Sequence, residues 1–388
     1  MKTELLGCSI AWLLAWGTAW SSPLEPAIAR FEPDGLRLNE IQLVGTHNSY
    51  HLEPDETLKA KFLEKYPLSR HYIKTLEYSH LPLNEQFDMG IRQIELDVFA
   101  DPDGGLYSQP RGAAPNTELP DEMNDPGLKV LHLQDVDFRS TCATFIRCLQ
   151  TVKLWSDANP DHLPILVLVE AKDSRIPAVV EEALSMEFTQ PIPFDEAALE
   201  TIDLEIRSVF PEEKLITPDA VRGDYSTLNQ AVLARGWPQL DESRGKIIFA
   251  LDNGGTIRDR YTRGFPSLEG RVLFVNAPPG TDEAAFLKRN NPFDRQIPHF
   301  VQQGYLVRTR ADAGTHEARA NDTARRDAAF ASGAQFVSTD YPIPDRALSS
   351  YSVAFPGNLT ARCNPMNTSP GCQFDIQAIA EAIEQTDR

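Results

Sequence analysis

The sequence predicts an α/β protein, and within that class a (β/α)₈ TIM-type barrel with long loop insertions. Eight short apolar runs recur along the chain and alternate with helix-like stretches. Runs such as 165–169 and 247–251 are apolar throughout, as are strands buried on both faces of a parallel sheet. Strands that alternate with helices over about 300 residues fit a barrel. A doubly wound open sheet is the alternative, but no glycine-rich phosphate-binding motif follows the first strand.

The elements follow in this order. The expected strands are 41–46, 91–98, 129–133, 164–170, 246–251, 271–275, 304–309 and 335–338. The expected helices are 54–64, 82–88, 143–157, 177–186, 195–207, 282–289 and 315–331. Two long polar stretches, 100–127 and 210–245, interrupt the alternation and are expected to be irregular loops. In a barrel, such loops could cover the active face.

Both ends of the chain lie outside the expected barrel domain, which spans 36–350. The first 21 residues resemble a signal peptide, because Lys2 precedes an apolar run from Leu5 to Trp20 that ends among small residues. An uncleaved anchor is the alternative, although the run is short for a membrane span. We therefore expect a secreted or periplasmic protein. Residues 351–388 form a C-terminal tail that ends in an amphipathic helix carrying Phe374, Ile376, Ile379, Ala380 and Ile383.

Four cysteines remain once Cys8 leaves with the signal peptide. Their close spacing in an exported protein predicts two local disulfides, Cys142–Cys148 and Cys363–Cys372. On one continuous helix, six positions would separate the first pair of Cα atoms by about 9 Å, beyond disulfide reach. Cys142 should therefore precede the helix. Zinc ligation is the alternative, but no CxxC pair supports it.

The formal net charge of -19 bears on the partners of the protein. So acidic a chain is unsuited to binding nucleic acid or to presenting a polybasic surface to a membrane. If it acts on an anionic lipid, it needs local relief from repulsion, for example a bound cation.

Polar residues with catalytic potential end the first four expected strands. They are His47 and Asn48 after the first, Glu95 and Asp97 in the second, His132 in the third, and Glu170 with Lys172 at the fourth. In a parallel barrel the carboxyl ends of the strands meet at one face, so these side chains should converge. Two histidines, an amide and three carboxylates are suited to metal-assisted attack on a phosphodiester.

The same segments resemble the calcium-dependent, phosphatidylinositol-specific phospholipase C family, one of the PLC-like phosphodiesterases. The similar segments are His-Asn-Ser-Tyr at 47–50, residues 83–92, Glu-Leu-Asp at 95–97, residues 129–132 and 155–160, and Val-Glu-Ala-Lys at 169–172. A weaker similarity continues through 249–252 to 338–342. The resemblance covers residues 38–345 and leaves the tail out.

The resemblance implies a barrel that binds one Ca²⁺ through Asn48, Glu95, Asp97 and Glu170. It also implies cleavage of phosphatidylinositol to diacylglycerol and a cyclic inositol phosphate, by attack of the inositol 2-hydroxyl. His47 and His132 match the two catalytic histidines of the family. The chemistry agrees, since Ca²⁺ prefers oxygen ligands and two imidazoles can divide the proton transfers. We assign His132 as the general acid and His47 as the base or phosphate stabiliser.

Lys172 and three residues near the later strand ends complete the expected site. Lys172, Asp252, Arg308 and Arg310 are candidates for contact with inositol hydroxyls or phosphate. In a closed barrel the eighth strand pairs with the first, which would place Asp340 beside His47. A carboxylate there would orient the ring of His47 and favour its charged form.

Two other functions fit the same barrel. A glycerophosphodiester phosphodiesterase usually carries Arg-Gly after the first histidine, where this chain has Asn48-Ser49. A non-catalytic barrel that binds inositol lipids would not need both histidines and all four expected ligands. We therefore expect an enzyme that meets phosphatidylinositol or a related inositol lipid at a membrane surface, acts as a monomer and binds no nucleic acid.

Overall fold

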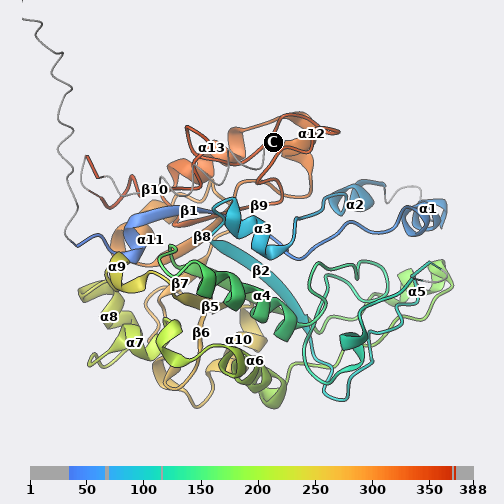
Figure 1. Ribbon diagram of the computed structural model, residues 1–388, viewed down its shortest axis with the longest axis horizontal. Helices are drawn as coiled ribbons and strands as arrows, with labels where there is room; N and C mark the ends of the chain where they lie inside the picture. Colours follow the sequence, from blue (N-terminus) through green and yellow to red (C-terminus); the bar gives the residue numbers. More distant parts are fainter. Residues whose placement is uncertain (1–34, 66–69, 115–116, 369–370, 373–388) are drawn as a thin grey trace, which may run out of the picture.

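The computed structural model describes residues 35–65, 70–114, 117–368 and 371–372. The expected signal peptide and the expected C-terminal helix, with Phe374, Ile376, Ile379, Ala380 and Ile383, lie outside these residues. In the described part the strands lie at the centre and helices pack around them (Figure 1). The predicted α/β class is therefore confirmed.

The strands form two sheets of five strands each. Their bounds are β1 (Ile41–Thr46), β2 (Gln93–Phe99), β3 (Lys129–Val130), β4 (Ile165–Ala171), β5 (Ile247–Leu251), β6 (Leu273–Val275), β7 (Phe286–Lys288), β8 (Leu306–Arg310), β9 (Phe336–Thr339) and β10 (Ala361–Cys363). The sheet orders are β10-β1-β9-β8-β7 and β3-β2-β4-β5-β6. Among the described residues, antiparallel pairing within the sheets is confined to the edge strands β10 and β3. The remaining strands are parallel, and β5 is buried throughout, as its uninterrupted apolar sequence predicts.

A closed barrel is not shown, because continuous ladders do not join the two sheets. Between β1 and β2, the side-chain Nε2 of Gln93 donates a hydrogen bond to the carbonyl of Thr46 at 3.0 Å. Gly45 makes room for this side chain, since a Cβ there would lie 2.1 Å from Oε1 of Gln93. Between β6 and β7, an isolated parallel bridge joins Asn276 and Phe286. The carboxyl ends of the parallel strands within each sheet still share an edge, which is the property that the site requires.

Two expected elements have a different structure. The expected barrel strand 129–133 is reduced to β3, which is antiparallel to β2 and so is not one of the parallel strands. The expected helix 282–289 is wrong, because this stretch contains β7, which pairs in parallel with β8. Residues 284–287 are all buried. Burial of consecutive residues is typical of a central strand, whereas an amphipathic helix buries one face.

The helices lie mainly outside the sheets. Their bounds are α1 (Glu56–Lys65), α2 (Arg70–Thr75), α3 (Leu83–Asp88), α4 (Phe145–Ala158), α5 (Ala178–Leu184), α6 (Glu196–Val209), α7 (Pro218–Arg222), α8 (Leu228–Ala234), α9 (Leu240–Ser243), α10 (Gly255–Thr262), α11 (Ile297–Gln303), α12 (His316–Ala320) and α13 (Ala324–Ala331), with 3₁₀ helices η1 (Leu38–Glu40), η3 (Asp121–Asn124), η4 (Glu212–Lys214) and η5 (Pro266–Leu268). Helices α1, α2 and α5 lie at one end of the molecule, at the right of Figure 1. No helix of the described ranges has both the length and the apolar character needed to cross a bilayer.

The stretch 210–245 is more regular than its composition suggests, and the expectation of an irregular loop there is wrong. It contains α7, α8 and α9. The side chain of Thr217 accepts a hydrogen bond from the amide of Ala220, and Thr227 caps the next helix in the same way. Threonine at an N-cap satisfies an amide that the helix leaves unpaired. Short helices with polar caps have the composition of a loop, which explains the error.

The expected tail begins as part of a sheet. Strand β10 pairs antiparallel with β1, with Cys363 opposite Ile41. The disulfide Cys363–Cys372 follows, and its Cα atoms are 6.1 Å apart. The Cα atoms of Cys142 and Cys148 are 5.2 Å apart, and Cys142 precedes α4 as the spacing argument requires. Both predicted disulfides are confirmed.

Replacing Cys142 and Cys148 together by serine should lower the free energy of unfolding by about 2 kcal/mol, the loop-closure entropy expected for a short loop. The bridge closes a separation of six residues at the start of α4. Urea denaturation with and without a reducing agent measures the effect, because reduction of the native protein should cause at least the same loss. An unchanged free energy of unfolding in the double variant would contradict this expectation.

Candidate active site

A tight turn after β1 presents His47 and Asn48. The backbone of Asn48 is left-handed, with φ of 44°. Asparagine adopts this conformation more readily than most residues. The next residue, Ser49, joins the backbone of β2: its amide donates to the carbonyl of Glu95 at 2.9 Å, and its Oγ accepts from the amide of Glu95 at 2.8 Å. The turn therefore holds Asn48 next to the part of β2 that carries Glu95.

Four carboxylates gather at the carboxyl ends of β2, β4 and β5. Glu95 and Asp97 are two residues apart on β2 and so point to the same side of the strand. Glu170 is the register partner of Asp97 on β4. Asp252 follows β5, and carboxylate oxygens of Glu95, Glu170 and Asp252 lie within 4.8 Å of one another. Asp252, expected as a substrate contact, is thus part of the carboxylate group.

Three cations face these carboxylates. Arg308 Nη2 lies 2.5 Å from Glu95, Lys172 Nζ lies 3.3 Å from Asp97 and 3.5 Å from Glu170, and Lys288 Nζ pairs with Asp252. Four negative and three positive charges leave a net charge of -1 when every group is ionised, so the group retains attraction for a cation. Sequence reasoning missed Lys288, because it lies in the stretch expected to be a helix.

The carboxylate group also has unpaired oxygen atoms. Oδ1 of Asp97 and Oδ1 of Asp252 are buried and accept no hydrogen bond from the described residues, whereas Oδ2 of Asp97 lies 3.3 Å from Nζ of Lys172. Buried oxygens without a hydrogen bond are unfavourable, so these atoms are candidates for contact with a bound cation. The amide Nδ2 of Asn48 donates to the hydroxyl of Tyr78 at 3.2 Å, which leaves its carbonyl oxygen available as a ligand. These oxygen donors fit Ca²⁺, which prefers carboxylate and amide oxygens.

Burial raises the pKa of two of these carboxyls. For Glu95 the pKa rises to about 8, because burial and the neighbouring carboxylates outweigh Arg308. For Asp97 the pKa rises to about 7, because burial outweighs Lys172. Without a cation, both groups therefore take up protons near neutral pH, whereas a bound cation favours the charged forms.

The raised pKa values predict how calcium and pH act together on stability. A carboxyl whose folded pKa is raised stabilises the fold below its unfolded pKa, and this contribution is lost as pH rises through the folded value, here about 7 to 8. Differential scanning calorimetry should therefore show that Ca²⁺ raises Tm more at about pH 8.5 than at about pH 6. An equal increase at both pH values would contradict the expectation.

His47 lies between a carboxylate and a guanidinium. Its Nδ1 donates to Oδ1 of Asp340 at 2.8 Å, and its Nε2 accepts from Nη1 of Arg310 at 3.0 Å. This pattern describes a neutral ring with the proton on Nδ1. Burial, and then the charge of Arg310, lower the pKa of His47 well below its ordinary value, although Asp340 opposes this. Strand β9 positions Asp340, because it pairs in parallel with β1.

His132 belongs to a separate network just after β3. Its Nδ1 lies 2.7 Å from Oδ2 of Asp137, which also faces Nε2 of His51. Burial acts to raise the pKa of Asp137, but His51 and His132 together lower it to about 2. The side chain of His132 is 21 % exposed, and its Nε2 has no hydrogen-bond partner among the residues that the structure describes. This nitrogen is therefore free to act on a substrate.

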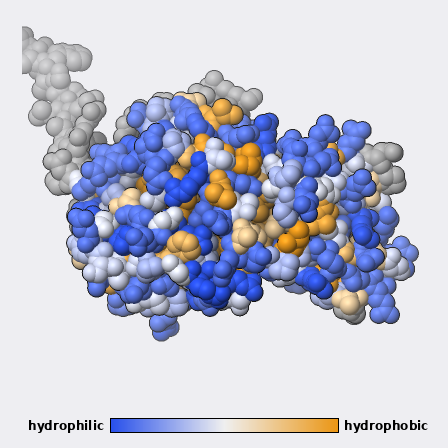
Figure 2. Space-filling model, turned by 90° about the horizontal axis from the view of Figure 1, so that it is seen from below, coloured by the Kyte–Doolittle hydropathy of each residue, from blue (hydrophilic) through white to orange (hydrophobic). Residues whose placement is uncertain are grey.

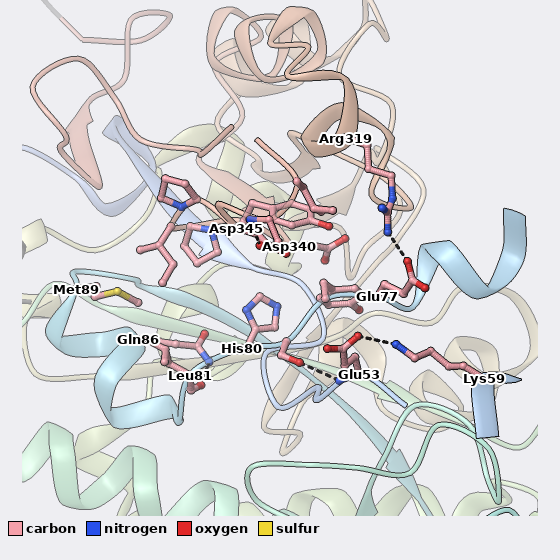
Figure 3. A pocket seen from close by; sticks show the side chains of 18 of the residues that line it. Glu53, Lys59, Glu77, His80, Leu81, Gln86, Met89, Arg319, Asp340 and Asp345 are labelled. Carbon is pink, nitrogen blue, oxygen red and sulfur yellow. Dashed lines mark hydrogen bonds and ion pairs between the residues drawn. The ribbon is translucent and has the colours of Figure 1, made fainter. Parts of the chain in front are cut away.

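A cleft of about 510 Å³ has Asp340 in its lining (Figure 3), and Asp340 binds His47. His80 lies in this cleft, and its Nε2 donates to the backbone carbonyl of His47 at 2.8 Å. Ion pairs Glu53–Lys59 and Glu77–Arg319 and the apolar side chains of Leu81 and Met89 are among its lining. The cleft reaches Asp340 but not the four carboxylates, so it adjoins the site from one side.

The structure places the expected site residues in three groups. The first is His47 with Arg310 and Asp340; the second is Glu95, Asp97, Glu170 and Asp252 with Lys172 and Arg308, next to Asn48; the third is His132. Sequence reasoning missed Asp137, which has no apolar strand before it. Nor did it assign a role to His51. The signal that could have revealed Asp137 is its position in a short polar turn five residues after His132.

Two solved structures of one bacterial enzyme agree with the fold. The calcium-dependent phosphoinositol-specific phospholipase C of a Gram-negative Pseudomonas sp., in its apo form with myo-inositol, is 14% identical with a TM-score of 0.50, over 85% of this chain and 96% of that chain. A second crystal form of the apo enzyme gives the same identity and TM-score over 84% and 95%. A Ca²⁺-dependent phosphatidylinositol-specific phospholipase C from Streptomyces antibioticus is 18% identical, with a TM-score of 0.49, over 79% and 95%.

The sequence itself matches a family model. The comparison with curated protein sequences gave no match. The model described as phosphoinositide phospholipase C, Ca²⁺-dependent, matches residues 36–365, which include β1, β10 and every strand between them. The chain therefore belongs to the Ca²⁺-dependent phosphoinositide phospholipase C family.

Proposed function

We propose that this protein is an exported, Ca²⁺-dependent phospholipase C that cleaves phosphatidylinositol to diacylglycerol and a cyclic inositol phosphate. The observation that carries the proposal is the group of carboxylates at the strand ends, in which oxygens of Glu95, Glu170 and Asp252 lie within 4.8 Å of one another beside the fully buried Asp97. The two disulfides support export, since disulfides persist in oxidising compartments.

The proposed cation ligands are Asn48, Glu95, Asp97 and Glu170, with Asp252 as an additional candidate. Bound there, Ca²⁺ would supply positive charge to the phosphoryl oxygens and lower the pKa of a coordinated hydroxyl. Lys172 and Arg308 balance the carboxylates in its absence, at 3.3 Å from Asp97 and 2.5 Å from Glu95. If Ca²⁺ takes over the carboxylates, the side chains of Lys172 and Arg308 become available for phosphate or inositol hydroxyls.

His47 is the proposed base. Its neutral ring can accept the proton of the inositol 2-hydroxyl at Nε2, once Arg310 turns from this nitrogen to the substrate phosphate. Asp340 then stabilises the imidazolium and holds the ring in place through Nδ1. His132 is the proposed acid, which gives a proton from Nε2 to the glycerol oxygen as the ester bond breaks.

Exposed hydrophobic side chains on segments that connect the strands suit a lipid substrate. Tyr72 on α2, and Leu106, Phe293 and Ile343 in the segments after β2, β7 and β9, are between 37% and 57% exposed. Figure 2 shows a mainly hydrophilic face on which apolar side chains gather in a few patches. We propose that the four named residues contact the membrane, and that the two sheets act together as one barrel-like scaffold beneath them.

Phosphorus NMR with three substrates tests the function. The purified protein is given phosphatidylinositol, glycerophosphoinositol and phosphatidylcholine, each with Ca²⁺ and with EGTA. A five-membered cyclic phosphate formed from phosphatidylinositol only with Ca²⁺ is the expected result. Direct formation of a monoester from glycerophosphodiesters would indicate a glycerophosphodiester phosphodiesterase instead. Binding of inositol lipid without turnover would indicate a non-catalytic barrel.

A further inference from the structure

We propose that Asp137 and His51 are positioning residues that prepare His132 to donate its proton to the leaving group. The inference rests on the proposed function and adds to it the chemistry of the acid. It is carried by three contacts within one buried network: His132 Nδ1 to Asp137 Oδ2 at 2.7 Å, His51 Nε2 to Asp137 Oδ1 at 2.9 Å, and His51 Nδ1 to the carbonyl of Tyr78 at 3.0 Å.

A tight turn fixes Asp137 relative to His132. The carbonyl of Asp137 accepts hydrogen bonds from the amides of His132 at 3.1 Å and Leu133 at 2.9 Å. Its amide donates in return to the carbonyl of Leu133 at 3.0 Å. The side chain of Asp137 is fully buried. Because backbone and side chain of the same residue both bind His132, the ring of His132 is held in one orientation, with Nδ1 donating and Nε2 free.

His51 supplies the second donor to Asp137. Both of its ring nitrogens face acceptors, a carboxylate and a backbone carbonyl, and neither acceptor has a proton to give. The ring of His51 is thus held at both nitrogens, by the carboxylate of Asp137 at Nε2 and by the carbonyl of Tyr78 at Nδ1. This ring is fully buried and stacks on Tyr78 with centroids 4.3 Å apart, so it cannot exchange partners by rotation into solvent.

The second donor fixes Asp137 as well as His132. Oδ1 of Asp137 lies 2.9 Å from Nε2 of His51, and Oδ2 lies 2.7 Å from Nδ1 of His132, so both oxygens of the carboxylate are held. His51 is held in turn by the carbonyl of Tyr78. Nε2 of His132 is therefore kept in one place, as a proton donor to a departing alkoxide requires.

The distances among the same three side chains are those of hydrogen bonds. A tetrahedral site with bonds of about 2.1 Å holds its ligand atoms about 3.4 Å apart. The ligand atoms of Asp137 lie 2.7 Å from His132 and 2.9 Å from His51, which are ordinary hydrogen-bond distances. The group is better described as a hydrogen-bonded network than as a vacant metal centre.

The test compares two leaving groups. Diacylglycerol leaves as an alkoxide and needs an acid, whereas p-nitrophenolate leaves without one. We expect Asp137→Asn to lower kcat about 10²-fold on phosphatidylinositol and less than about threefold on p-nitrophenyl myo-inositol phosphate. His51→Gln should show the same pattern with a smaller loss, and keeps the inference testable if Asp137→Asn does not fold.

Asp135→Asn is the matched control. Asp135 lies in the same turn, is buried, and accepts hydrogen bonds from Arg111 and Thr189 rather than from a histidine. Its replacement should change kcat on both substrates alike and only slightly. If Asp137→Asn lowered kcat equally on both substrates, the inference would be overturned and the proposed function would remain intact. If the unaltered protein turned over neither substrate with Ca²⁺, the proposed function would fail, and the inference with it.

Discussion

His132→Ala should abolish turnover of phosphatidylinositol while leaving Ca²⁺ binding nearly unchanged. A general acid contributes about 10²- to 10⁴-fold to a rate, and the alkoxide of diacylglycerol is a poor leaving group without one. Calcium binding should persist because His132 contacts Asp137 rather than the four carboxylates. Phosphorus NMR measures kcat, and isothermal titration calorimetry measures the affinity for Ca²⁺ in the same preparation.

His71→Ala provides the control for this variant. His71 is exposed and stacks on His316, with ring centroids 4.8 Å apart, and it contacts none of the candidate site residues. Its replacement should leave both kcat and Ca²⁺ affinity unchanged. Normal turnover in His132→Ala would refute the assignment of the acid. Loss of Ca²⁺ binding together with turnover would show that His132 supports the metal ligands instead.

The site residues that could be predicted from the sequence are those that end buried strands. Asp97 and Glu170 each interrupt an apolar run, and parallel pairing makes them neighbours whether or not the barrel closes. Asp340 follows for the same reason, because β9 pairs with β1 and its next residue meets His47. Strand direction and register determine which of these side chains become neighbours, and both can be predicted from apolar periodicity.

The residues that could not be predicted depend on irregular backbone. Asp137 reaches His132 through a turn whose hydrogen bonds are local, and no periodic pattern marks it. Lys288 was hidden because a three-residue strand is too short to show its period. The contact between β1 and β2, which belong to different sheets, depends on a hydrogen bond from the side chain of Gln93 to the carbonyl of Thr46. Gly45 makes room for this side chain. Closure of a barrel is therefore harder to predict than the order of its strands.

Asp97→Asn should weaken Ca²⁺ binding at least tenfold, and so lower turnover at limiting Ca²⁺, while it stabilises the protein in EGTA. The two effects have opposite signs because Asp97 is buried and has a pKa raised to about 7, while its ion-pair partner Lys172 keeps a second carboxylate, Glu170, at 3.5 Å. Above that pH, the neutral amide removes a buried charge, which should raise the free energy of unfolding by about 1–3 kcal/mol. The same change removes a ligand charge, for which about 10- to 100-fold in affinity is a reasonable scale.

The variant Asp101→Asn tests whether replacing any buried aspartate would have these two effects. Asp101 is also buried and ion-paired, at 3.1 Å from Lys129, and it accepts from the amide of Leu106. Unlike Lys172, Lys129 has no second carboxylate among the ion pairs of the described residues. Replacement of Asp101 leaves Lys129 without a charged partner and should destabilise the protein without changing Ca²⁺ affinity. Thermal unfolding in EGTA and calorimetric titration with Ca²⁺ measure both quantities. If Asp97→Asn destabilised the protein as Asp101→Asn does, Asp97 would be a structural carboxylate. A gain in stability coupled to a loss of affinity is the behaviour of a carboxylate kept charged and buried for a cation.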